Sequence, residues 1–243
     1  MARIISATSA YENLEEGRYL GVCYKIIDQG TILESFQGGA PAPKLKVRIG
    51  FEIIDTLDLD GAPTGENIRM ADGRPFVIDF QYTNSLNEKA RLCKDLVSWR
   101  GRNFTPEEQE GFDMANLFGK SVNIEVGLTS GGNPKITGLF KPNGGVQSMD
   151  TINEITDFEL ETYLDEFRDK SSDASKKMCD IWEGMTAWMQ DEIKTSLEYV
   201  DVMRKFDEKP NGVEGLAAIA NKRPNEKVVN QDDEKFIDDD IPF

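Results

Sequence analysis

The sequence predicts an α+β protein whose core is mainly β. Alternating β-branched and aromatic residues fill much of the first part of the chain, helix-start signals divide these segments into two groups, and apolar residues recur every three or four positions through 174–206. A chain of 243 residues has room for one large domain or two small ones with a real hydrophobic core.

Three consecutive strands are expected in the first half of the chain. Segments 17–27 and 44–54 are joined by a Gly/Pro loop, and a third strand region covers 67–83 with an interruption near Asp72 and Gly73. The second segment would carry three cations on one face, Lys44, Lys46 and Arg48, and core residues on the other, Leu45, Val47, Ile49 and Phe51. The third would carry on one side Phe76, Ile78, Phe80 and Tyr82.

A helical connection and a closing hairpin are expected next. Two capping boxes, Ser85 to Glu88 and Thr105 to Glu108, predict two helix starts, and the second helix is expected to end at Gly119. Strands at 121–128 and 135–140 then flank a Gly-rich turn, with inward residues Val122, Ile124, Val126 and Leu128. Three strands, a helical connection and two strands follow the order of a five-stranded OB-fold barrel.

The chain changes character after this barrel. A Gly-rich link is followed by a third capping box, Thr156 to Glu159, and by amphipathic helices in which Gly184 is expected to interrupt the pattern. Beyond Asp207 the sequence is polar and punctuated by Pro and Gly, which is typical of a disordered linker. We therefore expect an OB-fold domain at 1–149, an acidic helical appendage at 150–206, and a flexible linker with an acidic tip at 207–243.

Composition excludes several function classes. The chain has no histidine, so neither a Ser-His-Asp triad nor an HExxH zinc site exists in it. Its three widely spaced cysteines indicate neither a disulfide framework nor zinc, and phosphate-loop and dinucleotide motifs are absent from the sequence. A calcium loop around Asp55, Asp58 and Asp60 would lack its bidentate acid, so these are interpreted as turn residues. We expect no enzyme activity, cofactor or metal.

Charge is distributed unevenly along the chain. The net charge is −16, but residues 1–149 hold 16 basic against 19 acidic residues, whereas 150–209 hold 8 against 17. Binding of nucleic acid depends on where cations cluster, so the near-neutral first part remains a candidate. The N-terminal segment lacks a secretory apolar region and no apolar run is long enough for a bilayer span, so a soluble, cytoplasmic protein without membrane contact is expected.

The last residues form the most specific motif. The last thirteen residues contain six acids and end in three apolar residues with the free carboxylate. The tip itself consists of Asp238, Asp239, Asp240, Ile241, Pro242 and Phe243. This ending resembles the acidic tip of bacterial single-stranded DNA-binding proteins, which docks replication and repair enzymes. The longer helical connection and the helical appendage resemble instead the single-stranded DNA-binding proteins of tailed bacteriophages. The resemblance implies an OB-fold body, a role in phage replication or recombination within the infected bacterial cell, and protein partners for the tip.

Candidate contacts to single-stranded DNA fall into two groups. Trp99, Arg100, Arg102 and Phe104 interleave aromatics with cations, which suits stacked bases and bound phosphates, although a core Trp99 beside a solvated loop fits equally well. The cations Lys44, Lys46 and Arg48 line either a groove or an ordinary solvent face. Phe80 and Tyr82 are core residues if their side of the strand faces the barrel interior. Weaker candidates are Lys25, Arg69, Lys135 and Lys141.

The sequence thus predicts sequence-independent coating of single-stranded DNA, with the tip recruiting replication proteins. One alternative is a carboxylate-metal nuclease using acids such as Asp55, Asp58 and Asp79, which only the abundance of acids favours. The other is an acidic DNA-mimic or interaction protein that occupies a basic partner. Oligomeric state is not predicted.

Overall fold

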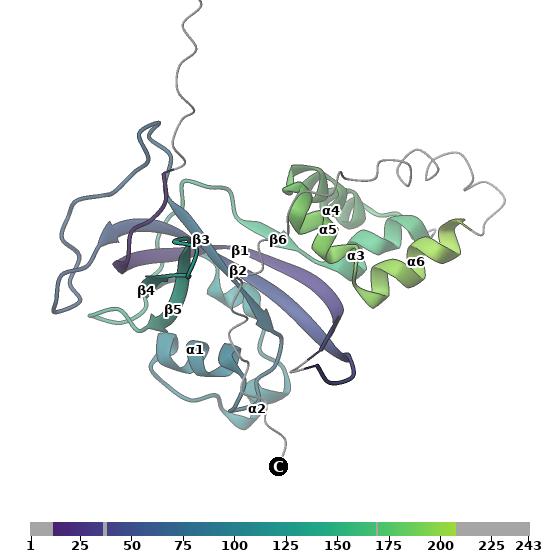
Figure 1. Ribbon diagram of the computed structural model, residues 1–243, viewed down its shortest axis with the longest axis horizontal. Coiled ribbons are helices and arrows are strands. Elements are labelled where there is room, and N and C mark those ends of the chain that lie inside the picture. Colours follow the sequence, from purple (N-terminus) through teal and green to yellow (C-terminus); the bar gives the residue numbers. More distant parts are fainter. Residues whose placement is uncertain (1–11, 36–37, 169, 208–243) are drawn as a thin grey trace, which may run out of the picture.

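The computed structural model describes residues 12–35, 38–168 and 170–207, and it confirms an α+β protein built on a mostly antiparallel sheet (Figure 1). Its elements in chain order are β1 (Gly17–Glu34), β2 (Ala42–Thr56), β3 (Val77–Thr83), α1 (Arg91–Arg100), α2 (Pro106–Glu110), the 3₁₀ helix η1 (Met114–Leu117), β4 (Ser121–Leu128), β5 (Pro134–Phe140), β6 (Thr156–Phe158), α3 (Leu160–Leu164), the 3₁₀ helix η2 (Asp165–Arg168), α4 (Asp173–Gly184), α5 (Ala187–Ile193) and α6 (Leu197–Asp207).

The hydrogen-bonded strand order is β3-β2-β1-β4-β5, and β6 pairs in parallel with β1. The sheet therefore has six strands rather than the five expected, and in the described residues hydrogen bonds do not close it into a barrel. The sixth strand lies where the third capping box predicted a helix start. Thr156 pairs there with Lys25 and Phe158 with Ile27, so tertiary pairing overrides the local helix signal.

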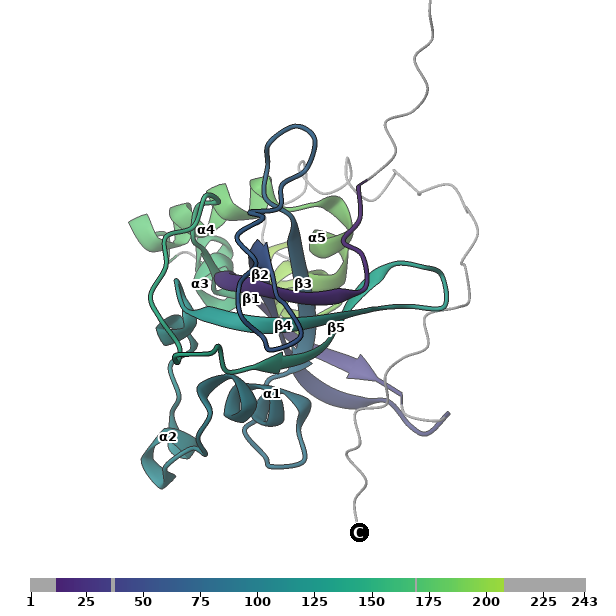
Figure 2. The ribbon, with the colours of Figure 1, turned by 90° about the vertical axis from the view of Figure 1, so that its left-hand side faces the viewer.

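Helix α1 bridges the two ends of this strand order. The hydroxyl of Tyr82 on β3 donates to Asp95 on α1 at 2.9 Å, and Arg91 on α1 donates to the carbonyl of Ile136 on β5 at 2.8 Å. Figures 1 and 2 show α1 and α2 on one side of the strands and the α3 to α6 group on another. The helical connection between β3 and β4 thus contacts both β3 and β5.

Of the two predicted capping boxes in the connection, one forms. Thr105 and Glu108 cap α2 reciprocally, with Pro106 at the first helical position. The box at Ser85 does not form, because its hydroxyl accepts from the Asn87 amide in a turn and α1 begins only at Arg91. Helix α2 is also shorter than predicted, since it ends at Glu110 and a separate 3₁₀ helix follows.

Strand β3 is shorter than predicted, because backbone amides in the segment before β3 donate hydrogen bonds to Asp55. Its carboxylate accepts from Gly65, Glu66 and Asn67, which hold segment 57–76 in an irregular loop. Burial raises the pKa of Asp55, but these hydrogen bonds outweigh it and leave the pKa below its ordinary value. Asp58 similarly accepts from two amides of its own turn. Asp58 is a turn residue, as interpreted from the sequence, whereas Asp55 lies near the end of β2 and binds the loop that follows.

Most positions predicted to face the core are buried, with two corrections. Val122, Ile124 and Val126 are fully buried on β4, whereas Leu128 is 43% exposed at the end of that strand. Leu45 on β2 is exposed as well, because it lies where the long β1-β2 ribbon extends beyond the rest of the sheet. Strand alternation thus predicts the buried face only where another layer covers it.

The helical appendage has its own hydrophobic core and packs directly on β1. That core combines Ile27 of β1 with Phe158, Tyr163 and other residues of the helices. Gly30 on β1 has φ +72°, and a Cβ there would lie 2.5 Å from Leu160 Cδ2, so this glycine permits the close approach. The predicted helical region divides into α4, α5 and α6, and α4 ends at Gly184 as expected.

The described residues include no helix long and apolar enough to cross a membrane. The linker after Asp207 and the tip at Asp238 to Phe243 lie outside the described residues.

Candidate nucleic-acid interface

Lys46 and Arg48 share one surface of β2, as the alternation predicted, and strand register brings Lys25 of β1 beside them. We call these three residues the closed cationic face, because each is paired with acid. Lys25 Nζ lies 3.2 Å from Asp79 Oδ2, and Arg48 Nη1 lies 2.8 Å from the other oxygen of Asp79. Lys46 Nζ lies 2.7 Å from Glu34 Oε2 and also donates to Thr83.

The appendage covers this face through α5. Glu192 accepts from Arg48, Gln29 and Gln81 at 3.2, 2.7 and 2.8 Å, and the Trp188 ring lies 4.7 Å from the Arg48 guanidinium carbon. The side chains of Arg48 and Lys46 are only 12% and 7% exposed. Carboxylates from the same chain thus occupy the positions where phosphates would have to bind.

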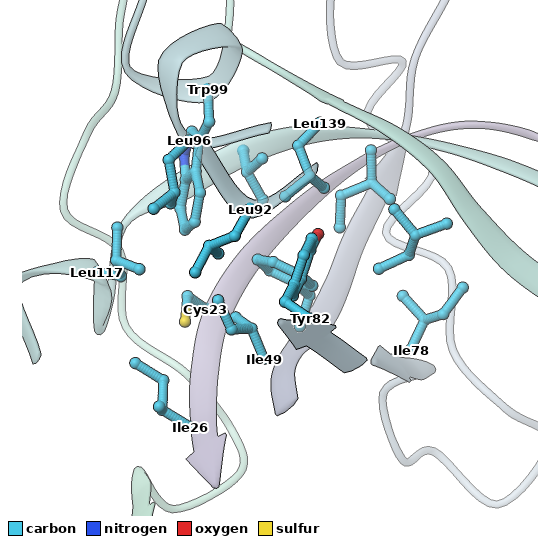
Figure 3. Close-up of a cluster of buried hydrophobic side chains, with 14 of the residues drawn as sticks. Cys23, Ile26, Ile49, Ile78, Tyr82, Leu92, Leu96, Trp99, Leu117 and Leu139 are labelled. Atoms are coloured by element: carbon cyan, nitrogen blue, oxygen red, sulfur yellow. The ribbon is translucent and has the colours of Figure 1, made fainter. Parts of the chain in front are cut away.

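The aromatic candidates belong to the core. Trp99 is 1% exposed, lies edge-on to Phe51, and donates its indole N–H to the carbonyl of Ser121 at 2.7 Å. Figure 3 shows Trp99, Leu96 and Leu92 pointing from α1 toward the sheet. Tyr82 and Phe104 are also buried, and Phe80 is half-buried with Arg91 over its ring. The core interpretation of Trp99 is the one that this packing supports.

A second group of cations surrounds an open pocket of about 360 Å³ beside the end of α1. Arg100, Arg102 and Lys120 line it, and the side chain of Lys141 packs against Gly101 in the same α1 end. We call these four cations and the pocket the arginine groove. They come from the end of α1, the start of β4 and the end of β5, and the further lining residues are Trp99, Glu108, Phe112, Asn116, Leu117 and Val146.

Glu108 is the one acid among the residues that line this pocket, and it holds both arginines. Its carboxylate lies 2.7 Å from Arg102 Nη2, pairs closely with Arg100, and accepts from the Thr105 amide at 3.0 Å. The hydrogen bond from Arg102 contributes most to lowering the pKa of Glu108 to about 2, followed by the Thr105 amide. Glu108 therefore stays ionised at neutral pH.

Arg100 is held in place by aromatic rings. Its guanidinium carbon lies 4.4 Å from the Phe104 ring centroid and 5.0 Å from that of Phe112. Within the described part of the chain its Nη1 is buried without a hydrogen-bond partner. Stacking orients the guanidinium beside the groove.

The remaining candidates are dispersed. Arg69 donates to three backbone carbonyls, those of Ile53, Ile54 and Ile68, and so has a structural role. Lys44 and Lys135 are half-buried on β2 and β5, away from the residues that line the groove. Sequence reasoning missed Lys120 and Phe112. Phe112 stands among acids and Lys120 is a single cation, so only the tertiary structure places them in one pocket with Arg100.

Among the described residues, no cluster of three or more acids and cysteines is arranged to hold a metal ion. Asp79, one of the acids considered for a nuclease, is engaged by Lys25 and Arg48. Comparison with protein-family models and with curated protein sequences found no match.

Proposed function

We propose that this protein binds single-stranded DNA without sequence preference, through an OB-fold body and the arginine groove. The proposed cellular role is the coating and protection of single strands in phage replication or recombination. The acidic tip at 238–243 would recruit replication proteins, a part of the proposal that rests on its sequence alone.

The strand order supports the OB-fold part of this proposal. In an OB-fold barrel the first strand pairs with the second and the fourth, and here β1 pairs with β2 and β4. The strands β3 and β5, which would meet in a closed barrel, lie close together, and helix α1 is tied to both by side-chain hydrogen bonds. In the described residues no ladder of strand hydrogen bonds joins β3 to β5, so the proposed barrel would be closed there by packing alone.

The observation that carries the functional proposal is the convergence of Arg100, Arg102, Lys120 and Lys141 around one open pocket. Three of these cations line the pocket together with only one acid, and Lys141 lies beside it at Gly101, although the whole chain has a large excess of acids. Clustered cations bind phosphates by releasing counterions, irrespective of base sequence. The closed cationic face offers no comparable site, because its charges are already neutralised.

The test is binding of the full chain to a fluorescent oligo-dT and to a duplex of equal length, at two salt concentrations, with and without Mg²⁺. We expect tighter binding to the single strand, weakened by salt and insensitive to Mg²⁺. Equal affinity for the duplex, or no binding to either, would contradict the proposal. Cleavage that appears only with Mg²⁺ would favour the nuclease alternative.

A further inference from the structure

We propose that a pocket beside Phe140 holds one base of the bound strand, which deepens the proposed function and rests on it. This Phe140 pocket has a volume of about 190 Å³ and lies over β1, β4 and β5. The lining residues that matter to the argument are Arg18, Gly61, Asn123, Glu125 and Phe140. It is distinct from the arginine groove, since none of these residues lines both.

Phe140 is a large ring left on the surface of the sheet. It is 47% exposed, although the aromatic rings of the neighbouring core are buried or half-buried. A Cβ added at Gly138 would lie 2.9 Å from two ring atoms of Phe140, so the ring rests on this glycine. The glycine fixes the position of the ring, and the exposed remainder provides an apolar surface on which a base can stack.

The polar groups of the pocket suit a neutral, planar ligand. Arg18 Nε and Glu125 Oε1 lie 3.8 Å apart, with side chains 56% and 42% exposed, so opposite charges balance and attract a phosphate weakly. The amide of Asn123 both donates and accepts hydrogen bonds, which allows contact with the edge of any base. The pocket therefore favours a nucleobase over the sugar-phosphate backbone.

The position of Phe140 links the two sites. Phe140 is the last residue of β5, and Lys141 follows it with its side chain packed against Gly101 in the arginine groove. Adjacent Cα atoms are about 3.8 Å apart. The Phe140 pocket and the arginine groove are therefore adjacent along the chain, within reach of one bound strand.

The experiment compares oligo-dT with an abasic oligonucleotide of the same length and charge, using the full chain. We expect Phe140→Ala to weaken binding to oligo-dT by about 5- to 150-fold, the range measured for loss of one stacked base, and to leave abasic binding unchanged. Phe140→Tyr should keep the affinity. Phe140→Leu, which keeps apolar bulk against Gly138 but cannot stack, should behave like Phe140→Ala even if the latter melts early.

The matched control is Leu128→Ala, which removes a residue of similar exposure, 43%, from the other end of the same hairpin. Leu128→Ala should change neither the affinity for oligo-dT nor the affinity for the abasic strand. Unchanged oligo-dT binding in both Phe140→Ala and Phe140→Leu would overturn the base pocket while leaving the proposed function intact. Equal losses on oligo-dT and on the abasic strand would also overturn it. Failure of the unmodified protein to bind any single strand would instead reject the proposed function.

Discussion

The closed cationic face and the arginine groove contain similar numbers of cations and differ in what neutralises them. Lys25, Lys46 and Arg48 lie on a continuous sheet surface, and distant parts of the chain supply their carboxylates, Glu192 on α5 among them. The groove collects its cations from three segments around an open pocket. Availability to an anion therefore depends on which acids the fold brings near, and a regular basic pattern does not establish it.

The largest difference should appear in stability. Arg48→Ala leaves Asp79 and Glu192 without their shared partner in a largely buried site. We expect it to lower the free energy of unfolding by about 3 kcal/mol in a denaturant titration, as for other broken buried ion pairs. Arg74→Ala, the removal of an arginine whose side chain is 75% exposed, is the control and should cost less than about 0.5 kcal/mol.

The distinction between the closed cationic face and the arginine groove would be wrong if Arg48→Ala is as stable as the unmodified protein and binds single strands more weakly. That result would mean that α5 leaves this face and that Arg48 contacts phosphate.

The second difference should appear in DNA binding. The double variant Arg102→Ala and Lys120→Ala removes two cations at the groove, so its binding should weaken about 10- to 100-fold at low salt. The slope of log affinity against log salt should fall by about 1.4, which is two phosphate contacts on a single strand. Lys94→Ala, a change of an exposed lysine on α1 that does not line the pocket, should alter neither quantity. An unchanged slope in the double variant would remove the groove from the interface.

A smaller effect is expected from the acid inside the groove. Glu108→Gln removes the negative charge that competes with DNA for Arg100 and Arg102, whereas a glutamine at this position still completes the capping box of α2. We expect binding to tighten by up to about fivefold at low salt, in line with the modest strength of exposed ion pairs. Glu110→Gln makes the same charge change on the same helix and should have less effect. Weaker binding of Glu108→Gln would show that the carboxylate supports the groove instead of competing within it.

The smallest effect is the pH dependence of the same contact. The pKa of Glu108 is about 2 in the folded protein and 4.5 ordinarily, so its stabilising contribution is complete above pH 4.5 and disappears as the pH falls toward 2. The difference in Tm between the unmodified protein and Glu108→Gln should therefore be largest near neutral pH and narrow between pH 4.5 and 2. A constant difference across this range would mean that Glu108 has an ordinary pKa.

Local signals succeeded where a segment makes its own hydrogen bonds. The capping box at Thr105 forms because Glu108 reaches the helix start within the same turn. The equivalent patterns at Ser85 and Thr156 fail, because the Ser85 hydroxyl bonds inside a turn and Thr156 pairs with β1. Sequence patterns therefore predict elements more reliably than they predict where those elements begin.

In the candidate site, too, the sequence predicted some features correctly and tertiary packing overrode others. The segment from Trp99 to Phe104 was identified from its composition, and its two arginines do line the groove. Its aromatics do not offer stacking faces, because Trp99 and Phe104 are packed into the core. Phe140, an exposed ring at the end of β5, is not among the residues that the sequence pattern indicates for binding.

The sequence by itself determined the α+β class, the order of the first five strands with their helical connection, and the separation of a near-neutral β region from an acidic helical one, because periodicity and charge are local properties. Only the tertiary structure decided which cations are available. Arg48 is neutralised by acids about 30 and 140 residues away, and Lys120 reaches Arg100 only through the packing of α1 against the sheet. Ion pairing and burial depend on contacts between distant segments, and these contacts leave no pattern within any one of them.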